Sequence, residues 1–142
     1  MKKLLFMGVV TALTAGVPLT AFAQSQATTE IGTAHAHSVM AQAATSLALA
    51  HTHLHHVINC LVGPTGNGFD AAAGAPCTGQ GNGALKDAAS DAALVAKLND
   101  ALGDAQNGLK SSSLETVQQD AAKAAAALAA TPAQKSAGGY HW

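Results

Sequence analysis

Apolar side chains recur at helical spacing along three long stretches of the chain. The first stretch runs from about Thr33 to Val62, and its large apolar residues share one stripe at intervals of three, four and seven positions: Met40, Leu47, Leu54, Ile58 and Leu61. Gly63-Pro64 follows, where glycine can take the left-handed conformation that closes a helix and proline cannot continue one. The pattern predicts one continuous helix over residues 33–62.

Two further stretches show the same periodicity. The second expected helix, residues 84–107, carries leucines at intervals of four: Leu94, Leu98 and Leu102. The third, residues 112–131, opens on a capping box, Ser112-x-x-Glu115, in which a hydroxyl and a carboxylate each satisfy free backbone N–H groups. Its apolar positions continue at helical spacing: Leu114, Val117, Ala121, Ala124 and Leu128.

No stretch alternates apolar and polar residues as a half-buried strand does, so the sequence predicts an all-α fold. We expect a small antiparallel three-helix bundle over residues 33–131, or a four-helix bundle if the first helix breaks or if two chains pair. The segment between the first two helices, residues 63–83, is rich in glycine. It lacks the G-K-[ST] ending of a phosphate-binding loop, which indicates turns instead.

The two ends of the chain differ from the bundle. Residues 1–23 combine two lysines, an apolar run and the sequence Ala21-Phe22-Ala23, which is the pattern of a signal peptide cleaved after Ala23. A membrane anchor is the rival interpretation, and Pro18 with the small residues after it argues against one. We expect a flexible leader at residues 24–32, a flexible tail at 132–142, and a periplasmic or secreted protein.

Alanine dominates the composition, and few aromatic residues are available to fill a core. Small domains with thin cores usually need a covalent bond or a metal ion to hold them together. Cys60 and Cys77, the two cysteines, predict one disulfide that pins the glycine-rich loop to the first helix. Thiolate ligation of a metal is the alternative.

Charge narrows the class of partner. Removal of residues 1–23 leaves five lysines, no arginine and eight acidic residues, a net charge of −3 with neutral histidine. That balance argues against binding to nucleic acid, which requires a basic surface. No segment after the signal peptide is long and apolar enough to span a membrane.

Histidine provides the candidate chemistry, since His51, His53, His55 and His56 lie within the ten residues HTHLHHVINC. On one straight helix, His51 and His55 form an i, i+4 pair beside the apolar stripe, and His53 and His56 form a second pair on another face. His37 shares the angular position of His55, but a continuous helix places it about 20 Å from His51 along the axis. One ion therefore cannot collect all four clustered rings.

Each pair can still bind copper, zinc or nickel with modest affinity and release the ion in acid. Further ligands would come from Asp or Met on another helix, from water, from a second copy of the protein, or from Met40 if the chain bends. A copper site of His53, His56 and reduced Cys60 is an alternative. Haem is disfavoured, because there is no C-x-x-C-H motif and few large apolar residues exist to line a pocket.

Other functions fit the sequence less well. His51-Thr52-His53 matches the H-x-H of barrel hydrolases, but no strands are expected, and no nucleophile motif such as G-x-S-x-G occurs. We therefore expect no enzymatic activity. We expect the metal-binding protein to be a monomer or a homodimer. The alternatives to metal binding are an acid-responsive histidine surface and a structural or partner-binding envelope protein in which the histidines are incidental.

Overall fold

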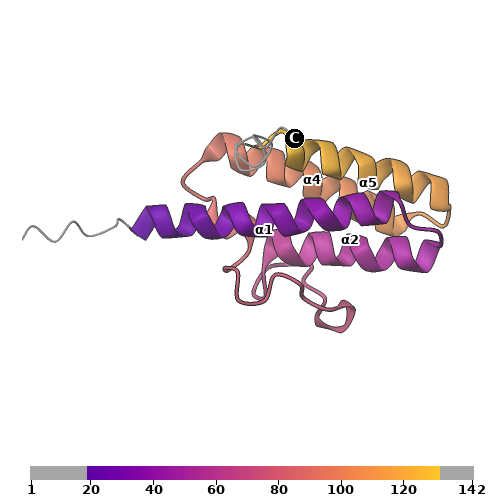
Figure 1. Ribbon diagram of the computed structural model, residues 1–142, viewed down its shortest axis with the longest axis horizontal. Helices are drawn as coiled ribbons and strands as arrows, with labels where there is room; N and C mark the ends of the chain where they lie inside the picture. Colours follow the sequence, from indigo (N-terminus) through magenta and orange to yellow (C-terminus); the bar gives the residue numbers. More distant parts are fainter. Residues whose placement is uncertain (1–18, 132–142) are drawn as a thin grey trace, which may run out of the picture.

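The structure, a computed structural model, describes residues 19–131 and is entirely helical over that range (Figure 1). Its elements, in chain order, are α1 Leu19–Gln42, α2 Leu47–Val62, the 3-10 turn η1 Ala71–Ala73, α3 Ala84–Asp87, α4 Ala92–Lys110 and α5 Leu114–Ala129. The all-α prediction is confirmed for the described part, and the count of three helices is wrong. The predicted tail, 132–142, and most of the predicted signal peptide, 1–18, lie outside the described residues.

The first expected helix is broken at residues 43–46. A four-helix bundle was the arrangement expected if this helix broke. Ser46 caps the new helix, because its side chain accepts a hydrogen bond of 3.2 Å from the backbone N–H of Leu49. The chain reverses at this point, so that α1 and α2 lie side by side and antiparallel (Figure 1). This reversal determines where the histidines meet.

Residues 24–32, expected as a flexible leader, belong to α1 instead. The buried positions of this helix recur at intervals of four and three, and all but Ile31 are small residues: Ala27, Ile31, Ala34, Ser38 and Ala41. Alanine and serine do not mark an apolar stripe strongly, yet they let neighbouring helices approach closely. The leader therefore becomes a packed helix because its small residues face the core.

The starts of the later helices also differ from expectation. The helix expected over 84–107 is divided into α3 and α4, and Asp91 caps α4 by accepting from Leu94 N at 3.0 Å. The N-cap of the third expected helix lies one residue later than predicted. Ser113, not Ser112, is its N-cap residue and accepts from Thr116 N at 3.4 Å.

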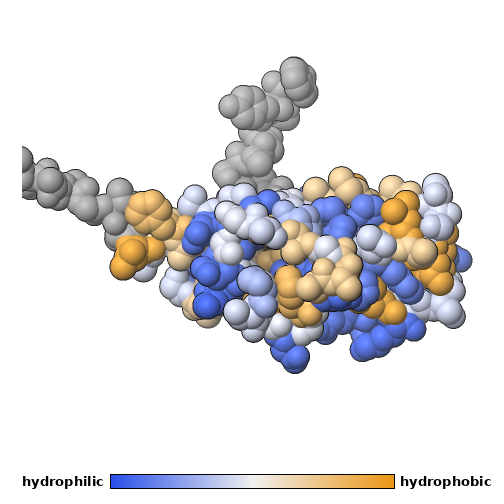
Figure 2. Space-filling view, turned by 90° about the horizontal axis from the view of Figure 1, so that it is seen from below, coloured by the Kyte–Doolittle hydropathy of each residue, from blue (hydrophilic) through white to orange (hydrophobic). Residues whose placement is uncertain are grey.

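Four long helices form a closed ring in the order α1, α2, α4, α5, each in contact with the next. The core between them holds few large side chains, chiefly Ile31, Leu54, Leu61, Leu98 and Leu128, with alanines between them. Among the described residues, no helix meets the length and hydropathy needed to cross a membrane. The face seen in Figure 2 accordingly shows apolar residues in separate patches among hydrophilic ones.

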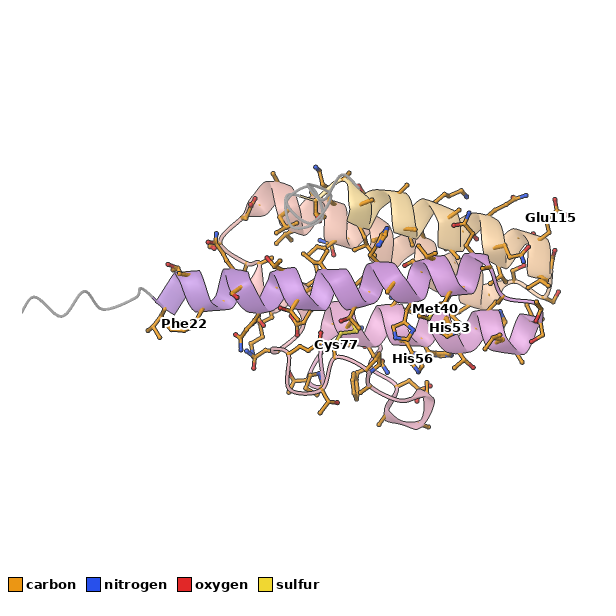
Figure 3. The ribbon with its side chains drawn as sticks, viewed as in Figure 1. Phe22, Met40, His53, His56, Cys77 and Glu115 are labelled. Atoms are coloured by element: carbon orange, nitrogen blue, oxygen red, sulfur yellow. A yellow bond between two sulfur atoms is a disulfide. The ribbon has the colours of Figure 1, made fainter. Side chains whose placement is uncertain are left out.

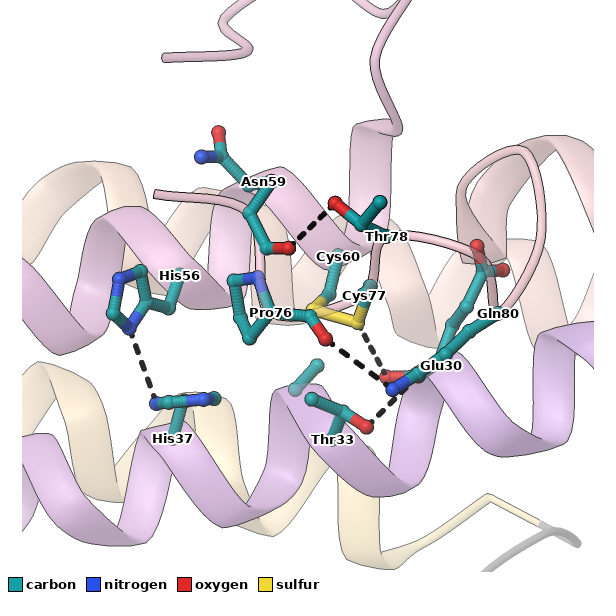
Figure 4. The surroundings of a disulfide bond; sticks show 12 residues. Glu30, Thr33, His37, His56, Asn59, Cys60, Pro76, Cys77, Thr78 and Gln80 are labelled. Carbon is teal, nitrogen blue, oxygen red and sulfur yellow. Dashed lines mark hydrogen bonds between the residues drawn. A yellow bond between two sulfur atoms is a disulfide. The ribbon is translucent and has the colours of Figure 1, made fainter. Parts of the chain in front are cut away.

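The glycine-rich segment 63–83 lies against the α1–α2 pair and is held there by the predicted disulfide between Cys60 and Cys77 (Figure 4). Thr33 of α1 adds a hydrogen bond from its hydroxyl to Gln80 Oε1, 2.9 Å long. The prediction of a disulfide that pins this loop to the helix is confirmed. The segment thus has contacts with both helices that carry the histidines.

Candidate metal site

Three histidines from two helices come together at the α1–α2 contact. His53 and His56 stand one turn apart on α2, and His37 faces them from α1. One ring nitrogen of each lies within 4.8 Å of the others, close enough to hold a metal ion. The reversal at residues 43–46 creates this group, because it folds α1 back along α2.

The nitrogens converge more closely than the rings do. His37 Nδ1 lies 3.1 Å from His53 Nδ1 and 3.3 Å from His56 Nδ1. The ring centroids are 4.6 to 5.9 Å apart, and the planes of His37 and His56 are inclined at 77°. Two nitrogens bound to one tetrahedral ion at the usual zinc–nitrogen distance are about 3.3 Å apart. The two short separations therefore have the size that a shared ion requires.

The glycine-rich segment orients the third ring. His56 Nε2 donates a hydrogen bond of 2.7 Å to the carbonyl oxygen of Ala73. In the neutral ring this fixes the proton on Nε2 and leaves the lone pair on Nδ1, toward His37. Gly74 follows at φ 93°, and a Cβ at this position would stand 3.2 Å from His56 Nε2. Glycine therefore suits both the backbone angle and the closeness of the ring.

Asn59, buried one turn beyond His56, holds the same segment in place. Its Nδ2 donates to the carbonyl oxygens of Asp70 and Gly74, both at 2.7 Å, and its Oδ1 accepts from Asp70 N at 2.8 Å. Asp70 in turn caps η1 through Ala72 N at 2.9 Å. The Ala73 carbonyl that orients His56 is thus tied to α2 on both sides.

The surroundings keep two of the rings neutral. Burial, followed by the nearby His56 and His53, lowers the pKa of His37 to about 4. Burial, followed by His56, also lowers the pKa of His53. Neutral imidazole is the form that binds metals, because protons compete for the same lone pair. His37 is therefore available as a ligand well below neutral pH.

The structure separates the two predicted pairs. His53 and His56 belong to the group of three. His51 and His55 do not, and each ring has another partner: His51 Nε2 donates to Ser111 O at 3.1 Å, and His55 Nδ1 lies 3.5 Å from Asp70 Oδ2. Within residues 19–131, no third His, Cys, Asp or Glu completes a site with the His51/His55 pair.

Sequence reasoning missed His37, because the continuous helix kept it far from the cluster. Ser46, a good N-cap residue after the small residues Ala43 and Ala44, is the one local signal of the break. The alternative copper site with reduced Cys60 is also corrected. Cys60 is bonded to Cys77 and supplies no thiolate in this structure.

A buried carboxyl group lies away from the histidines, at the other end of the segment 63–83. Glu30 is 1 % exposed, and its Oε1 accepts from Gly83 N at 2.8 Å. Burial, opposed by the hydrogen bond from Gly83 N and reinforced by the neighbouring Asp87 carboxylate, raises the pKa of Glu30 to about 7. The side chain therefore carries a proton over much of the acidic range.

Comparison of the chain with protein-family models, with curated proteins and with solved structures found no match.

Proposed function

We propose that this is an exported, non-enzymatic protein that binds a transition-metal ion through the Nδ1 atoms of His37, His53 and His56. The observation that carries the proposal is the convergence of these nitrogens from two helices, with separations of 3.1 and 3.3 Å at His37. The Cys60–Cys77 disulfide supports an oxidising compartment, and thus export.

The distribution of protons supports a metal ion over a simple hydrogen-bonded cluster. His56 already uses its Nε2 proton on Ala73 O, so in its neutral form its Nδ1 can only accept. A neutral His37 can offer one Nδ1 proton, which two acceptors at 3.1 and 3.3 Å would have to share. An ion at the centre interacts favourably with all three lone pairs at once. Copper, zinc and nickel all accept imidazole ligands.

Titration of the purified protein with copper, zinc and nickel tests the proposal. We expect one ion per chain, and we expect His37→Ala to weaken binding by about a hundredfold, because removal of a ligand exceeds the effect of losing an outer hydrogen bond. The matched control is His35→Ala, a histidine two residues away on α1 that lies outside the group of three.

A second comparison separates this site from the alternative pair. The double variant His51→Ala/His55→Ala should retain the stoichiometry and affinity of the wild-type protein. Loss of binding in that variant, with normal binding by His37→Ala, would assign the ion to His51 and His55 and contradict the proposed site. No binding of any of the three metals would favour the structural or partner-binding alternative.

A further inference from the structure

Met40 is the one methionine among residues 19–131, and it lies one turn after His37 on α1. Side chains on an α-helix lean toward its N-terminus, over the residues three and four positions earlier. The thioether of Met40 therefore extends toward the turn that carries His37. Figure 3 shows Met40 at the level of the α1–α2 pair where His53 lies.

Core packing does not explain this methionine. Met40 is 47 % exposed and is one of the few large apolar side chains that the described surface displays. The reversal at residues 43–46 places α2 beside α1, the helix that carries Met40. A bend of this kind was the condition under which the sequence predicted Met40 as a ligand. An exposed, unbranched side chain can reorient about three rotatable bonds at little cost in packing.

The three histidines leave a coordination position open. Among the described residues, no Cys, Asp, Glu or further His joins the group. Residues three apart on a helix have Cβ atoms about 5–6 Å apart. At this separation a histidine Nδ1 and a methionine Sδ can both bind the same ion. Met40 can thus reach the open position from the same side as His37.

We propose that Met40 Sδ is the fourth ligand and that the site is a copper site that holds Cu(I). Thioether sulfur is a soft ligand that favours Cu(I), whereas zinc sites in proteins use imidazole, thiolate and carboxylate. This inference depends on the histidine site proposed above. It adds the identity of the ion and a fourth residue to it.

The variant Met40→Leu, which conserves volume, tests the inference on the full oxidised protein. Cu(I) affinity is measured without oxygen against a coloured Cu(I) chelator, and Zn(II) affinity is measured against a zinc chelator. We expect Met40→Leu to weaken Cu(I) binding by about tenfold or more and to leave Zn(II) binding unchanged. Val39→Leu, a change at the exposed neighbour, serves as the control and should alter neither affinity.

X-ray absorption at the copper edge provides a second measurement. The wild-type protein should show one sulfur neighbour at about 2.3 Å, the usual metal–sulfur distance, and Met40→Leu should lose it. Equal Cu(I) affinities together with only nitrogen neighbours in the wild type would overturn the assignment of Met40, while Zn(II) binding would keep the histidine site intact. Failure of both ions to bind would instead overturn the histidine site, and this inference with it.

Discussion

At the scale of single residues, the buried carboxyl of Glu30 links stability to pH. Its pKa is raised to about 7 in the folded protein, whereas it is about 4.5 in an unfolded chain. The folded state therefore holds a proton between these values that the unfolded state has lost, so this group's contribution to stability decreases as the pH rises from about 4.5 to 7. The full loss would be no more than about 3 kcal/mol.

Glu30→Gln should remove this dependence, because glutamine does not ionise and its oxygen can still accept from Gly83 N. His37 acts in the opposite direction: its lowered pKa makes its contribution fall as the pH drops from about 6.5 to 4. The measurement is therefore the difference in unfolding free energy between variant and wild type, by urea denaturation at several pH values. A difference that is constant from pH 4.5 to 7.5 would contradict the raised pKa.

The lowered pKa of His37 would also determine how acid competes with an ion at the proposed site. Since His37 stays neutral down to about pH 4, it releases no proton on metal binding between pH 7 and 5. We expect a plot of log affinity against pH to have a slope of no more than two over that range. A slope near three would mean that all three rings are protonated before the ion binds.

At the scale of elements, Asn59 is the residue that fixes the segment behind His56. Asn59→Asp retains an acceptor for Asp70 N but loses both N–H donors to the buried carbonyls of Asp70 and Gly74. We expect a loss of about 3 kcal/mol in stability from these unpaired groups, together with roughly tenfold weaker metal binding. Thermal unfolding and metal titration measure the two effects.

Asn67→Asp is the matched control for that variant, because Asn67 lies exposed in the same segment. It makes the same chemical change without removing a buried hydrogen bond, and it should leave both stability and affinity close to wild type. If the two variants behaved alike, added negative charge rather than the lost hydrogen bonds would be the cause.

The elements also show where sequence reasoning succeeds and where it stops. The apolar rows of α2, α4 and α5 were predicted, as was the disulfide at the end of α2, whereas the start of α4 and the N-cap residue of α5 were not. The break at residues 43–46 was not predicted, because Ala43-Ala44-Thr45 contains neither glycine nor proline, and the high helix propensity of alanine favours a helix that continues. Tertiary packing of the small-residue face of α1 decides it. His53 and His56 were therefore identified, and His37 was not.

At the scale of the whole molecule, the bundle depends on close approach between helices. A Cβ added at Gly108 of α4 would lie 2.5 Å from Leu54 Cδ1 of α2, and Leu54 is fully buried. Gly108→Ala should therefore destabilise the protein by about 1–2 kcal/mol, since overpacking outweighs the better helix propensity of alanine. Denaturant unfolding measures the change.

Gly103 of the same helix offers the contrast, because a Cβ there would meet nothing within 4 Å. Gly103→Ala should stabilise the protein by up to about 1 kcal/mol through helix propensity alone. Equal effects of the two substitutions would contradict a close approach of Gly108 to Leu54 between α4 and α2.

The all-α architecture was evident from periodicity, whereas the order of the helices around the ring was not. Alanine supplies much of the interior, and a stripe of alanine and serine carries little information about which helix it faces. Leu54 and Leu98 mark their helices as buried, but they do not specify which helices are neighbours. Contacts between small side chains made that choice.

The reversal between α1 and α2 has a consequence for the folding equilibrium. That reversal separates His37 on α1 from His53 and His56 on α2. An ion bound to all three would therefore cross-link the two helices. An unfolded chain cannot hold these rings together, so binding should stabilise the folded state. The gain is about 2.7 kcal/mol when the free ion is at a hundred times its dissociation constant, and the melting temperature should rise accordingly. Ion supply in its compartment would thus influence how long the protein resists unfolding and proteolysis.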